Sequence, residues 1–197
     1  MADLKIDSRH TALLALDVQN WQAGAVRQAM PERADLPERL SRVAEAARKA
    51  GVAVVHVAVR LRDGYPEVSS RNRLFSVVRD NNWLKESAPE AQLHPAMAIG
   101  AGEPLVIKRR VSAFFATDLD VILRAKGIDT LVLAGISTSW VVLSTAAYAF
   151  DADYRLIFLE DCCADSEGEL HRVVAEKLLP KYGAVTDAQS FIAALKA

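Results

Sequence analysis

Polar side chains come directly after three apolar runs that have the composition of buried β-strands. They are Asp17, Gln19 and Asn20 after the first run, Lys108 at the end of the second, and Ser137 in the turn Gly135-Ile136-Ser137-Thr138. In open parallel sheets, ligands bind beyond the carboxyl ends of the strands, so such a fold would bring all of these residues to one edge. Asp17 and Lys108 in a shared apolar cleft would keep each other charged and could position a water or transfer a proton. The backbone amides of the turn suit an oxyanion or a carboxylate.

The elements that would position these residues alternate between strand and helix along the chain. Strands are predicted at 11–16, 52–59, 105–108, 130–134 and 154–159, and helices at 36–50, 117–127, 138–150 and 166–179. A short strand and a terminal helix are expected within residues 184–195. This alternation predicts a single α/β domain over residues 1–197, with three αβα layers and a doubly wound, mainly parallel, six-stranded sheet.

Local signals set the expected limits of two helices. They are the capping-box spacings of Asp35 with Glu38 and of Ser166 with Glu169, and the helix-ending Pro180. The helix predicted at 138–150 is apolar on nearly every side, which indicates deep burial. The polar stretch 60–82 is expected to be a long loop, and loops of that length are usually functional or mobile.

The composition favours a cytoplasmic protein with reduced thiols. Lysine and arginine total 24 and aspartate and glutamate total 25, which gives no reason to expect a nucleic-acid or membrane partner. No apolar run reaches the length of a transmembrane helix, and the polar N-terminus does not have the pattern of a signal peptide. Cys162 and Cys163 are neighbours in sequence, and such cysteines rarely pair with each other.

Five segments, in order along the chain, carry a resemblance to a known family. They are Leu16-Asp17-Val18-Gln19-Asn20, Lys108 with Ser112-Ala113-Phe114, Leu133-Ala134-Gly135-Ile136-Ser137-Thr138, Ser144-Thr145-Ala146, and Glu160-Asp161-Cys162-Cys163-Ala164-Asp165. Nearly the whole chain resembles the isochorismatase-like hydrolases, a superfamily that includes nicotinamidases and N-carbamoylsarcosine amidase. The resemblance implies a Rossmann-like fold, a homodimer or homotetramer, Asp17 as general acid or base, and Lys108 as its charged partner. It also implies a cis peptide at Ile136–Ser137.

The nucleophilic cysteine of this family is missing from the matching position. By the same resemblance that position is Val141, which follows Thr138 by three residues. A valine side chain cannot attack a carbonyl carbon, so the thioester route of the amidases is closed there. Cys162 and Cys163 are better explained as small core residues than as nucleophiles. A nearby serine would need a base, and Asp17 is a weak partner for a hydroxyl.

Acid–base chemistry with water stays open without a thiol. True isochorismatases resemble this chain in lacking the cysteine and keeping the aspartate and the lysine, and they cleave a vinyl ether by protonation of carbon followed by capture of water. No cofactor is expected. No metal is expected either, because residues 60–63 contain no histidine where metal-binding members have an Asp-x-His pattern. The four histidines, His10, His56, His94 and His171, have no ligand spacing.

Eight residues are predicted to contact a small-molecule substrate. They are Gln19, Asn20, Trp21, Arg60, Arg71, Phe114, Ser137 and Trp140. In the resemblance, Arg60 and Arg71 loosely match residues that hold the substrate's carboxylates, and arginine forks suit that group. The three aromatic residues would form walls that favour a flat or ring-bearing ligand. The arginines are also consistent with a solvated basic loop, and Trp140 with filling the pocket or packing between subunits.

Three functions remain open on the sequence alone. The first is a hydrolase for a small, anionic or ring-bearing substrate that uses Asp17, Lys108 and a water. The second is a catalytically silent member that binds a small ligand or a partner subunit, which the absent thiol and the bulk of Trp140 favour. The third is an amidase with a relocated nucleophile. Retention of both charged residues favours the first function, because an unused buried charge pair is costly.

Overall fold

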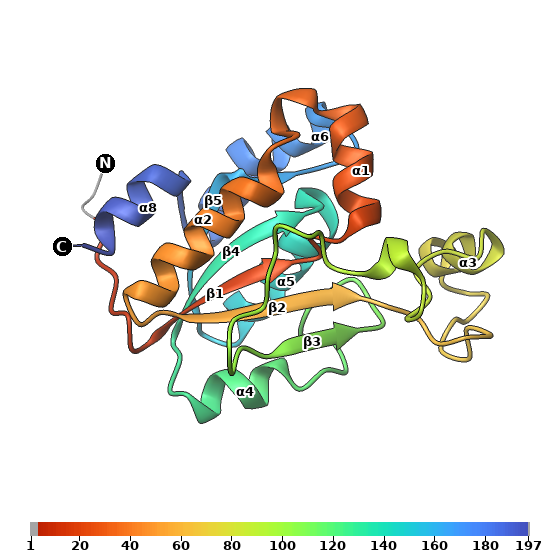
Figure 1. Cartoon of the computed structure of the whole chain (residues 1–197), viewed down its shortest axis with the longest axis horizontal. Coiled ribbons are helices and arrows are strands. Elements are labelled where there is room, and N and C mark those ends of the chain that lie inside the picture. The colour runs from red at the N-terminus through yellow and green to blue at the C-terminus, as the bar shows by residue number, and fades with distance from the viewer. Residues whose placement is uncertain (1–3, 197) are drawn as a thin grey trace.

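The six strands of the described chain lie in one parallel sheet, as predicted. The computed structural model describes residues 4–196. The strands are β1 (Thr11–Leu16), β2 (Ala53–Val59), β3 (Leu105–Lys108), β4 (Thr130–Ile136), β5 (Arg155–Ala164) and β6 (Ala184–Thr186). Their order across the sheet is β3-β2-β1-β4-β5-β6, and every neighbouring pair is parallel (Figure 1). The chain winds from β1 to one edge and then from β4 to the other, which confirms the doubly wound α/β fold.

Helices cover both faces of this sheet. They are α1 (Asn20–Ala29), α2 (Leu36–Lys49), α3 (Arg73–Asp80), α4 (Leu119–Ala125), α5 (Leu143–Asp151), α6 (Gly168–Val173), α7 (Leu179–Tyr182) and α8 (Ala188–Ala194). Side chains of α1, α2 and α8 pack in the core on one face, and those of α4, α5 and α7 pack in the core on the other. The sheet and its two helical covers form the three layers expected from the sequence.

The central strand β1 shows why the chain adopts these layers. Every residue of Thr11–Leu16 is buried. Because side chains alternate along a strand, Leu14 and Leu16 enter the core under α4 and α5, whereas Leu13 and Ala15 enter the core under α2. A strand buried on both faces is a continuous apolar run in the sequence, and that pattern predicted it.

The stretch 60–82, expected to be a loop, contains helix α3. The Asn72 side chain accepts a hydrogen bond from the backbone N–H of Phe75 and so caps this helix. Phe75 and Val78 point into a third apolar cluster beyond the main core. The loop prediction is therefore wrong over Arg73–Asp80, because two helical turns with one buried face give a weak pattern among charged residues. In Figure 1, α3 lies beyond the carboxyl ends of β2 and β3.

Two capping predictions and the expected role of Pro180 are wrong. The Asp35 carboxylate accepts a 2.7 Å hydrogen bond from Arg39 and does not cap α2. The Ser166 hydroxyl contacts the Asp165 carboxylate at 3.4 Å and does not cap α6. Pro180 lies in the first turn of α7, where a proline is tolerated because the first-turn amides have no helical partner.

The helix predicted at 138–150 begins with a wider, π-type turn at Thr138–Val142 and continues as α5. Trp140, Tyr148 and Phe150 on its outer face are 51%, 45% and 50% exposed. The expectation of burial on nearly every side is therefore wrong. A helix that covers a sheet buries only its inner face, whatever the composition of the outer one.

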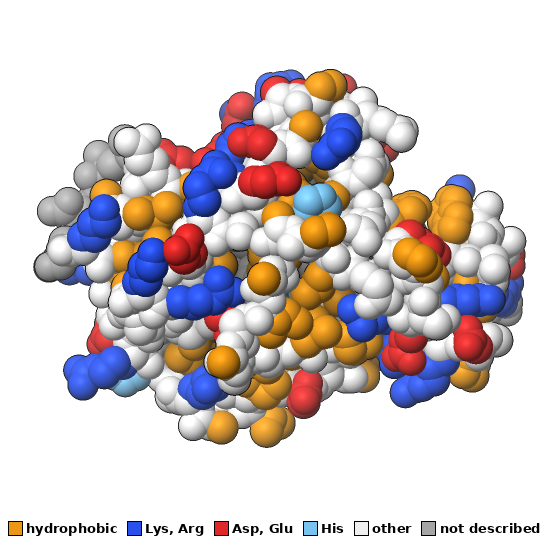
Figure 2. Space-filling model, viewed as in Figure 1, with side chains coloured by type: hydrophobic (Ala, Val, Ile, Leu, Met, Phe, Trp, Pro, Cys, Tyr) orange, Lys and Arg blue, Asp and Glu red, His pale blue; other side chains and the backbone are white. Residues whose placement is uncertain are grey.

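Charged side chains of both signs are interspersed over the face seen in Figure 2. This agrees with the near balance of 24 basic and 25 acidic residues in the sequence. A mixed surface of this kind gives no single-sign field that would steer a charged macromolecule to this face. Within residues 4–196, no helix has the length and hydrophobicity needed to span a membrane.

Candidate active site

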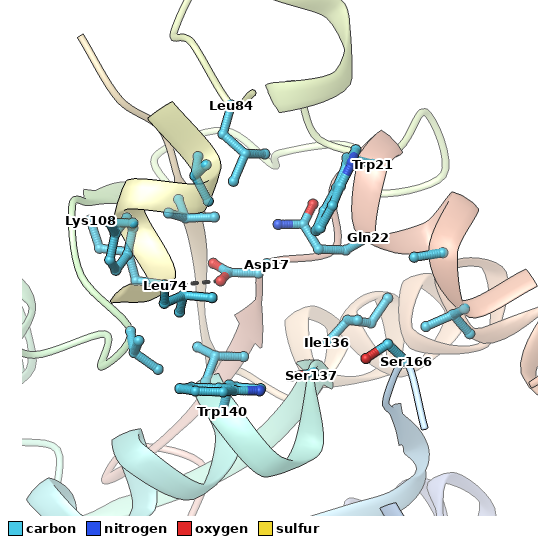
Figure 3. A pocket seen from close by; sticks show the side chains of 17 residues that line it. Asp17, Trp21, Gln22, Leu74, Leu84, Lys108, Ile136, Ser137, Trp140 and Ser166 are labelled. Carbon is cyan, nitrogen blue, oxygen red and sulfur yellow. Dashed lines mark ion pairs between the residues drawn. The ribbon is translucent and has the colours of Figure 1, made fainter. Parts of the chain in front are cut away.

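A cavity opens where the strand order reverses, between the carboxyl ends of β1 and β4. Its volume is about 230 Å³, and its lining comes from both strand ends, from α1 and α3, and from the turn before α5. The lining residues are Asp17, Trp21, Gln22, Ala25, Val26, Val59, Leu74, Phe75, Val78, Leu84, Lys108, Val111, Ile136, Ser137, Trp140, Val141 and Ser166 (Figure 3). Open α/β sheets bind ligands at this point, so the topology explains the location of the cavity.

Asp17 and Lys108 form an ion pair inside the cavity. The Lys108 Nζ atom lies 2.7 Å from Asp17 Oδ2 and donates a second hydrogen bond, 3.0 Å long, to the Arg110 carbonyl oxygen. Asp17 is 4% exposed and Lys108 is 2% exposed. Asp17 Oδ1 is buried and has no hydrogen-bond partner within residues 4–196. The pair therefore leaves one carboxylate oxygen free to meet a proton donor in the cavity.

The environment of Asp17 changes its acidity. Burial raises the pKa of Asp17 from its ordinary value of 3.8 to about 6, and the Lys108 ammonium group works against this rise. The carboxyl group therefore exchanges its proton close to neutral pH, where a side chain is effective as both acid and base. Asp17 also has a φ of +50°, a left-handed conformation in which a non-glycine residue is held only when its surroundings require it.

The turn after β4 brings Ser137 and Val141 to the cavity. Gly135 lets β4 approach β1 closely, because a Cβ atom at this position would lie 2.0 Å from the Leu16 carbonyl oxygen. The next peptide bond, Ile136–Ser137, is cis, as the resemblance implied. Val141 is buried and lines the cavity at the position that the resemblance assigned to the missing thiol.

Two buried side chains hold this turn in place. His171 Nδ1 lies 2.8 Å from the Thr138 hydroxyl oxygen, and His171 Nε2 lies 3.0 Å from Glu160 Oε1. The Asp165 carboxylate accepts a 2.7 Å hydrogen bond from the backbone N–H of Ser139, so this amide is not available to a ligand. His171 and Asp165 therefore support the site without lining the cavity.

Neither cysteine lines the cavity. Cys162 and Cys163 are buried in the cores on opposite faces of β5, which confirms the prediction that they pack as small apolar residues. Burial raises the pKa of both thiols, that of Cys163 to about 12, so both are protonated at neutral pH. In the part of the chain from residue 4 to residue 196, no group of three or more His, Cys, Asp or Glu side chains could hold a metal ion.

The structure brings six of the predicted site residues together. They are Asp17, Lys108, Val141, Trp21, Ser137 and Trp140. Both tryptophans are partly exposed, so they form walls near the opening and do not fill the cavity. Figure 3 shows Trp21 and Trp140 on different sides of Asp17. A ring-shaped ligand between these walls would have aromatic contact on more than one side.

Five other residues predicted to contact the substrate lie outside the lining, and two of them are taken up by the backbone. Gln19 is buried, and its side-chain amide donates to the carbonyl oxygens of Val59 and Ala91 and accepts from the Val59 N–H. Asn20 donates to the Pro89 carbonyl oxygen. These hydrogen bonds tie the chain after β1 to the neighbouring loop, so both amides act on the shape of the site rather than on a ligand.

Arg60, Arg71 and Phe114 are the other three. The Arg60 Nε–H donates to the Ala91 carbonyl oxygen at 3.1 Å. Arg71 lies in the exposed segment before α3. The Phe114 ring stacks on Tyr148, with the ring centroids 4.6 Å apart. Neither arginine brings a positive charge into the lining. Of the three aromatic residues predicted to form walls, the two tryptophans line the cavity and Phe114 does not.

Most of the lining residues that the sequence analysis missed are apolar. Leu74, Phe75 and Val78 come from α3, and Gln22 comes from α1. The spacing of 74, 75 and 78 is helical and was the available signal for the first three. No sequence pattern predicted Gln22 as a lining residue, because the sequence does not show which glutamine after Asp17 faces the cavity.

Comparisons with known proteins agree with this fold. Residues 11–190 match the family model for the isochorismatase domain. The chain is 31% identical over 205 residues to the isochorismatase family protein YwoC of Bacillus subtilis, covering 100% of both proteins. It is also 31% identical over 190 residues to a maleamate amidohydrolase of Pseudomonas putida, covering 95% of this chain and 88% of that protein.

A solved structure supports the same assignment at the level of the fold. The crystal structure of a cysteine hydrolase from Pseudomonas syringae pv. phaseolicola 1448A superposes with a TM-score of 0.85 at 23% identity, covering 98% of this chain and 95% of that one. The match of the family model over most of the chain decides the family. The chain belongs to the isochorismatase-like hydrolase superfamily.

Proposed function

We propose that the chain is a hydrolase that acts on a small molecule through Asp17, Lys108 and a bound water, without a thiol nucleophile. The observation that carries the proposal is the buried ion pair with one unpartnered carboxylate oxygen inside the cavity. A carboxyl group with a pKa of about 6 is present in both protonated and ionised forms near neutral pH. Val141 contributes only hydrocarbon to the lining, so covalent attack is not part of the proposed route.

Hydrolysis of a vinyl ether is the reaction class that this arrangement supports. Protonated Asp17 gives its proton to the terminal carbon of the C=C bond, whose π electrons form the new C–H bond and leave an oxocarbenium ion. A water attacks the cationic carbon and returns a proton to the Asp17 carboxylate, which gives a hemiketal. The hemiketal C–O bond then breaks while the hemiketal hydroxyl gives up its proton and the leaving oxygen gains one, which releases a carbonyl compound and an alcohol. Lys108 favours the ionised form of Asp17 between the two proton transfers.

The lining also bears on the substrate. The walls formed by Trp21 and Trp140 support a ring-bearing molecule. An anionic molecule has less support, because the predicted arginines lie outside the lining and Lys108 is paired with Asp17. The maleamate amidohydrolase of Pseudomonas putida is named for an acidic amide, and a substrate of that kind would need a cation that this lining does not supply.

Turnover of a panel of vinyl ethers, amides and carbamoyl compounds, followed by proton NMR, tests the proposal. Asp17→Asn is expected to lose about 100-fold or more in kcat/KM, because a general acid–base group contributes about 10²–10⁴-fold. The matched control is Asp151→Asn, at the exposed end of α5, which should keep wild-type turnover. Full turnover by Asp17→Asn would exclude Asp17 as the proton donor.

A catalytically silent, ligand-binding protein is the second candidate. It is supported by the lining residues, which are mainly apolar and include neither a cysteine nor a histidine. Ser137 lines the cavity, but within residues 4–196 its hydroxyl makes no hydrogen bond to a base and does not cap the following turn, so the amidase with a relocated nucleophile has less support. Saturable binding of a ring compound, with no turnover of any panel member, would favour the binding function.

A further inference from the structure

Gln22 is a polar side chain in the lining that no hydrogen bond of the described chain accounts for. It lies in the first turn of α1, is 7% exposed, and borders the cavity together with Asp17. Its Oε1 atom is buried and has no hydrogen-bond partner within residues 4–196. Figure 3 shows the Gln22 amide between Trp21 and Asp17, directed into the cavity.

The contrast with Gln19 shows that this free amide is unusual in its setting. Gln19, three residues earlier, makes three hydrogen bonds to the backbone of Val59 and Ala91. Buried polar groups are nearly always hydrogen-bonded, because an unpaired donor or acceptor loses its hydration without compensation. A hydrogen-bonding group in the cavity, either a water or a polar edge of a ligand that displaces it, would complete the hydrogen bonding of Gln22.

The charges of the lining restrict what that ligand can be. Among the lining residues, Asp17 and Lys108 are the charged ones, and they neutralise each other at 2.7 Å. The remaining lining is almost entirely hydrocarbon and aromatic. While Asp17 is ionised and paired with Lys108, a ligand carboxylate would lose its hydration here without meeting an unpaired cation, which is unfavourable. A neutral molecule avoids that loss.

We propose that Gln22 is a specificity-determining residue that selects neutral, ring-bearing ligands with a hydrogen-bond donor and an acceptor on one edge. A glutamine amide offers one acceptor and a donor group side by side, so it pairs with such an edge through two hydrogen bonds. Trp21 and Trp140 contact the apolar body of the ligand. The inference deepens the proposed function, because it assigns a substrate class to the same cavity.

Three probes of similar shape test this assignment: benzamide, benzoate and toluene. Their dissociation constants are measured by titration calorimetry with the full chain. The wild type should bind benzamide roughly tenfold more tightly than benzoate or toluene, which is the effect expected of two neutral hydrogen bonds. Gln22→Met, which keeps the length of the side chain and removes the amide, should weaken benzamide binding by about tenfold and bind toluene at least as well as the wild type does.

Gln22→Leu is the second variant, and Gln28→Met is the matched control on the exposed face of the same helix. Unchanged circular dichroism and urea unfolding establish that each variant is folded. The assignment is overturned if the wild type prefers benzoate, if it binds none of the three probes, or if both Gln22 variants bind benzamide within about twofold of the wild type. It is also overturned if Gln28→Met weakens benzamide binding as much as Gln22→Met does.

Binding and turnover separate this inference from the proposed function. If Asp17→Asn keeps full turnover while benzamide binding still depends on Gln22, the proton mechanism fails and the ligand assignment stands. If turnover depends on Asp17 while benzamide binding does not depend on Gln22, the ligand assignment alone fails.

Discussion

The pH dependence of stability in the wild type and in Asp17→Asn gives a direct test of the electrostatics of the site. The pKa of Asp17 is raised from 3.8 to about 6 by burial. A carboxyl group with a raised pKa in the folded state binds more protons when folded than when unfolded. Its contribution to stability is therefore fully present below about pH 3.8 and is lost as the pH rises through about 6.

The size of this loss follows from the same values. The folded and unfolded pKa values differ by about two pH units, and each unit corresponds to about 1.4 kcal/mol, so the loss amounts to about 3 kcal/mol. The asparagine side chain in the variant does not titrate. The free energy of unfolding of the wild type minus that of Asp17→Asn should therefore fall by roughly 2–3 kcal/mol between pH 4 and pH 8, because part of the full loss lies below pH 4. Loss of the Lys108 partner also destabilises the variant, so the change of this difference with pH, and not its absolute size, carries the prediction.

Urea unfolding followed by tryptophan fluorescence at several pH values between 4 and 8 gives both free energies. Asp151→Asn, changed at an exposed carboxylate, is the control for the effect of removing one acidic group. A difference curve that rises with pH would contradict a raised pKa of Asp17, because the Lys108 charge would then outweigh burial and lower that pKa. A flat curve would show that burial and the Lys108 charge cancel in their effect on the pKa of Asp17. Asp17 would then not be a proton donor near neutral pH.

Two further predictions concern the turn after β4. Val141→Cys should place a thiol in the cavity, and iodoacetamide should modify this thiol rapidly, as measured by mass spectrometry. Val142→Cys is the control, because Val142 is buried outside the lining and its thiol should stay protected like the two native ones. Equal labelling of both variants would contradict the position of Val141. Gly135→Ala should lower the free energy of unfolding by more than about 4 kcal/mol in urea titrations, because its Cβ atom would lie 2.0 Å from the Leu16 carbonyl oxygen and its φ is +144°. Gly24→Ala is the control, because Gly24 lies in a helix with open space for the new methyl group, and this variant should be neutral or stabilising by about 1 kcal/mol. A similar loss of unfolding free energy in both glycine variants would contradict the close contact of β4 with β1.

The fold was largely predictable because its elements are stabilised by burial patterns that are local in sequence. Continuous apolar runs predicted β1 to β4 and the first half of β5, since strands of a covered parallel sheet are buried on both faces; β5 continues beyond the predicted end at 159 to Ala164. Helices α1 and α3 were missed because each has only a short buried face, formed by two residues. The two helix caps were also predicted wrongly, because the Asp35 carboxylate accepts a hydrogen bond from Arg39 and the Ser166 hydroxyl contacts Asp165 instead of the helix amides.

The site was predictable in part. Asp17 and Lys108 could be placed together from sequence, because each follows a strand of a parallel sheet and the carboxyl ends of such strands meet at one edge. The arginines could not be placed, since Arg60 is held by a backbone carbonyl 31 residues away. Long polar side chains take the nearest unpaired partner, and that partner is set by how distant loops pack.

The layered sheet and the strand ends that carry the acid and the lysine could be read from the amino-acid sequence, and so could Val141 at the position where the resemblance expects a thiol. Which side chains face the cavity depends on how distant segments pack together. Gln19 is turned away by bonds to Val59 and Ala91, 40 and 72 residues away, while Gln22, one helical turn later, is left free. The physical reason is that a hydrogen bond depends on proximity in space, and spacing along the chain does not record which distant carbonyl will be near.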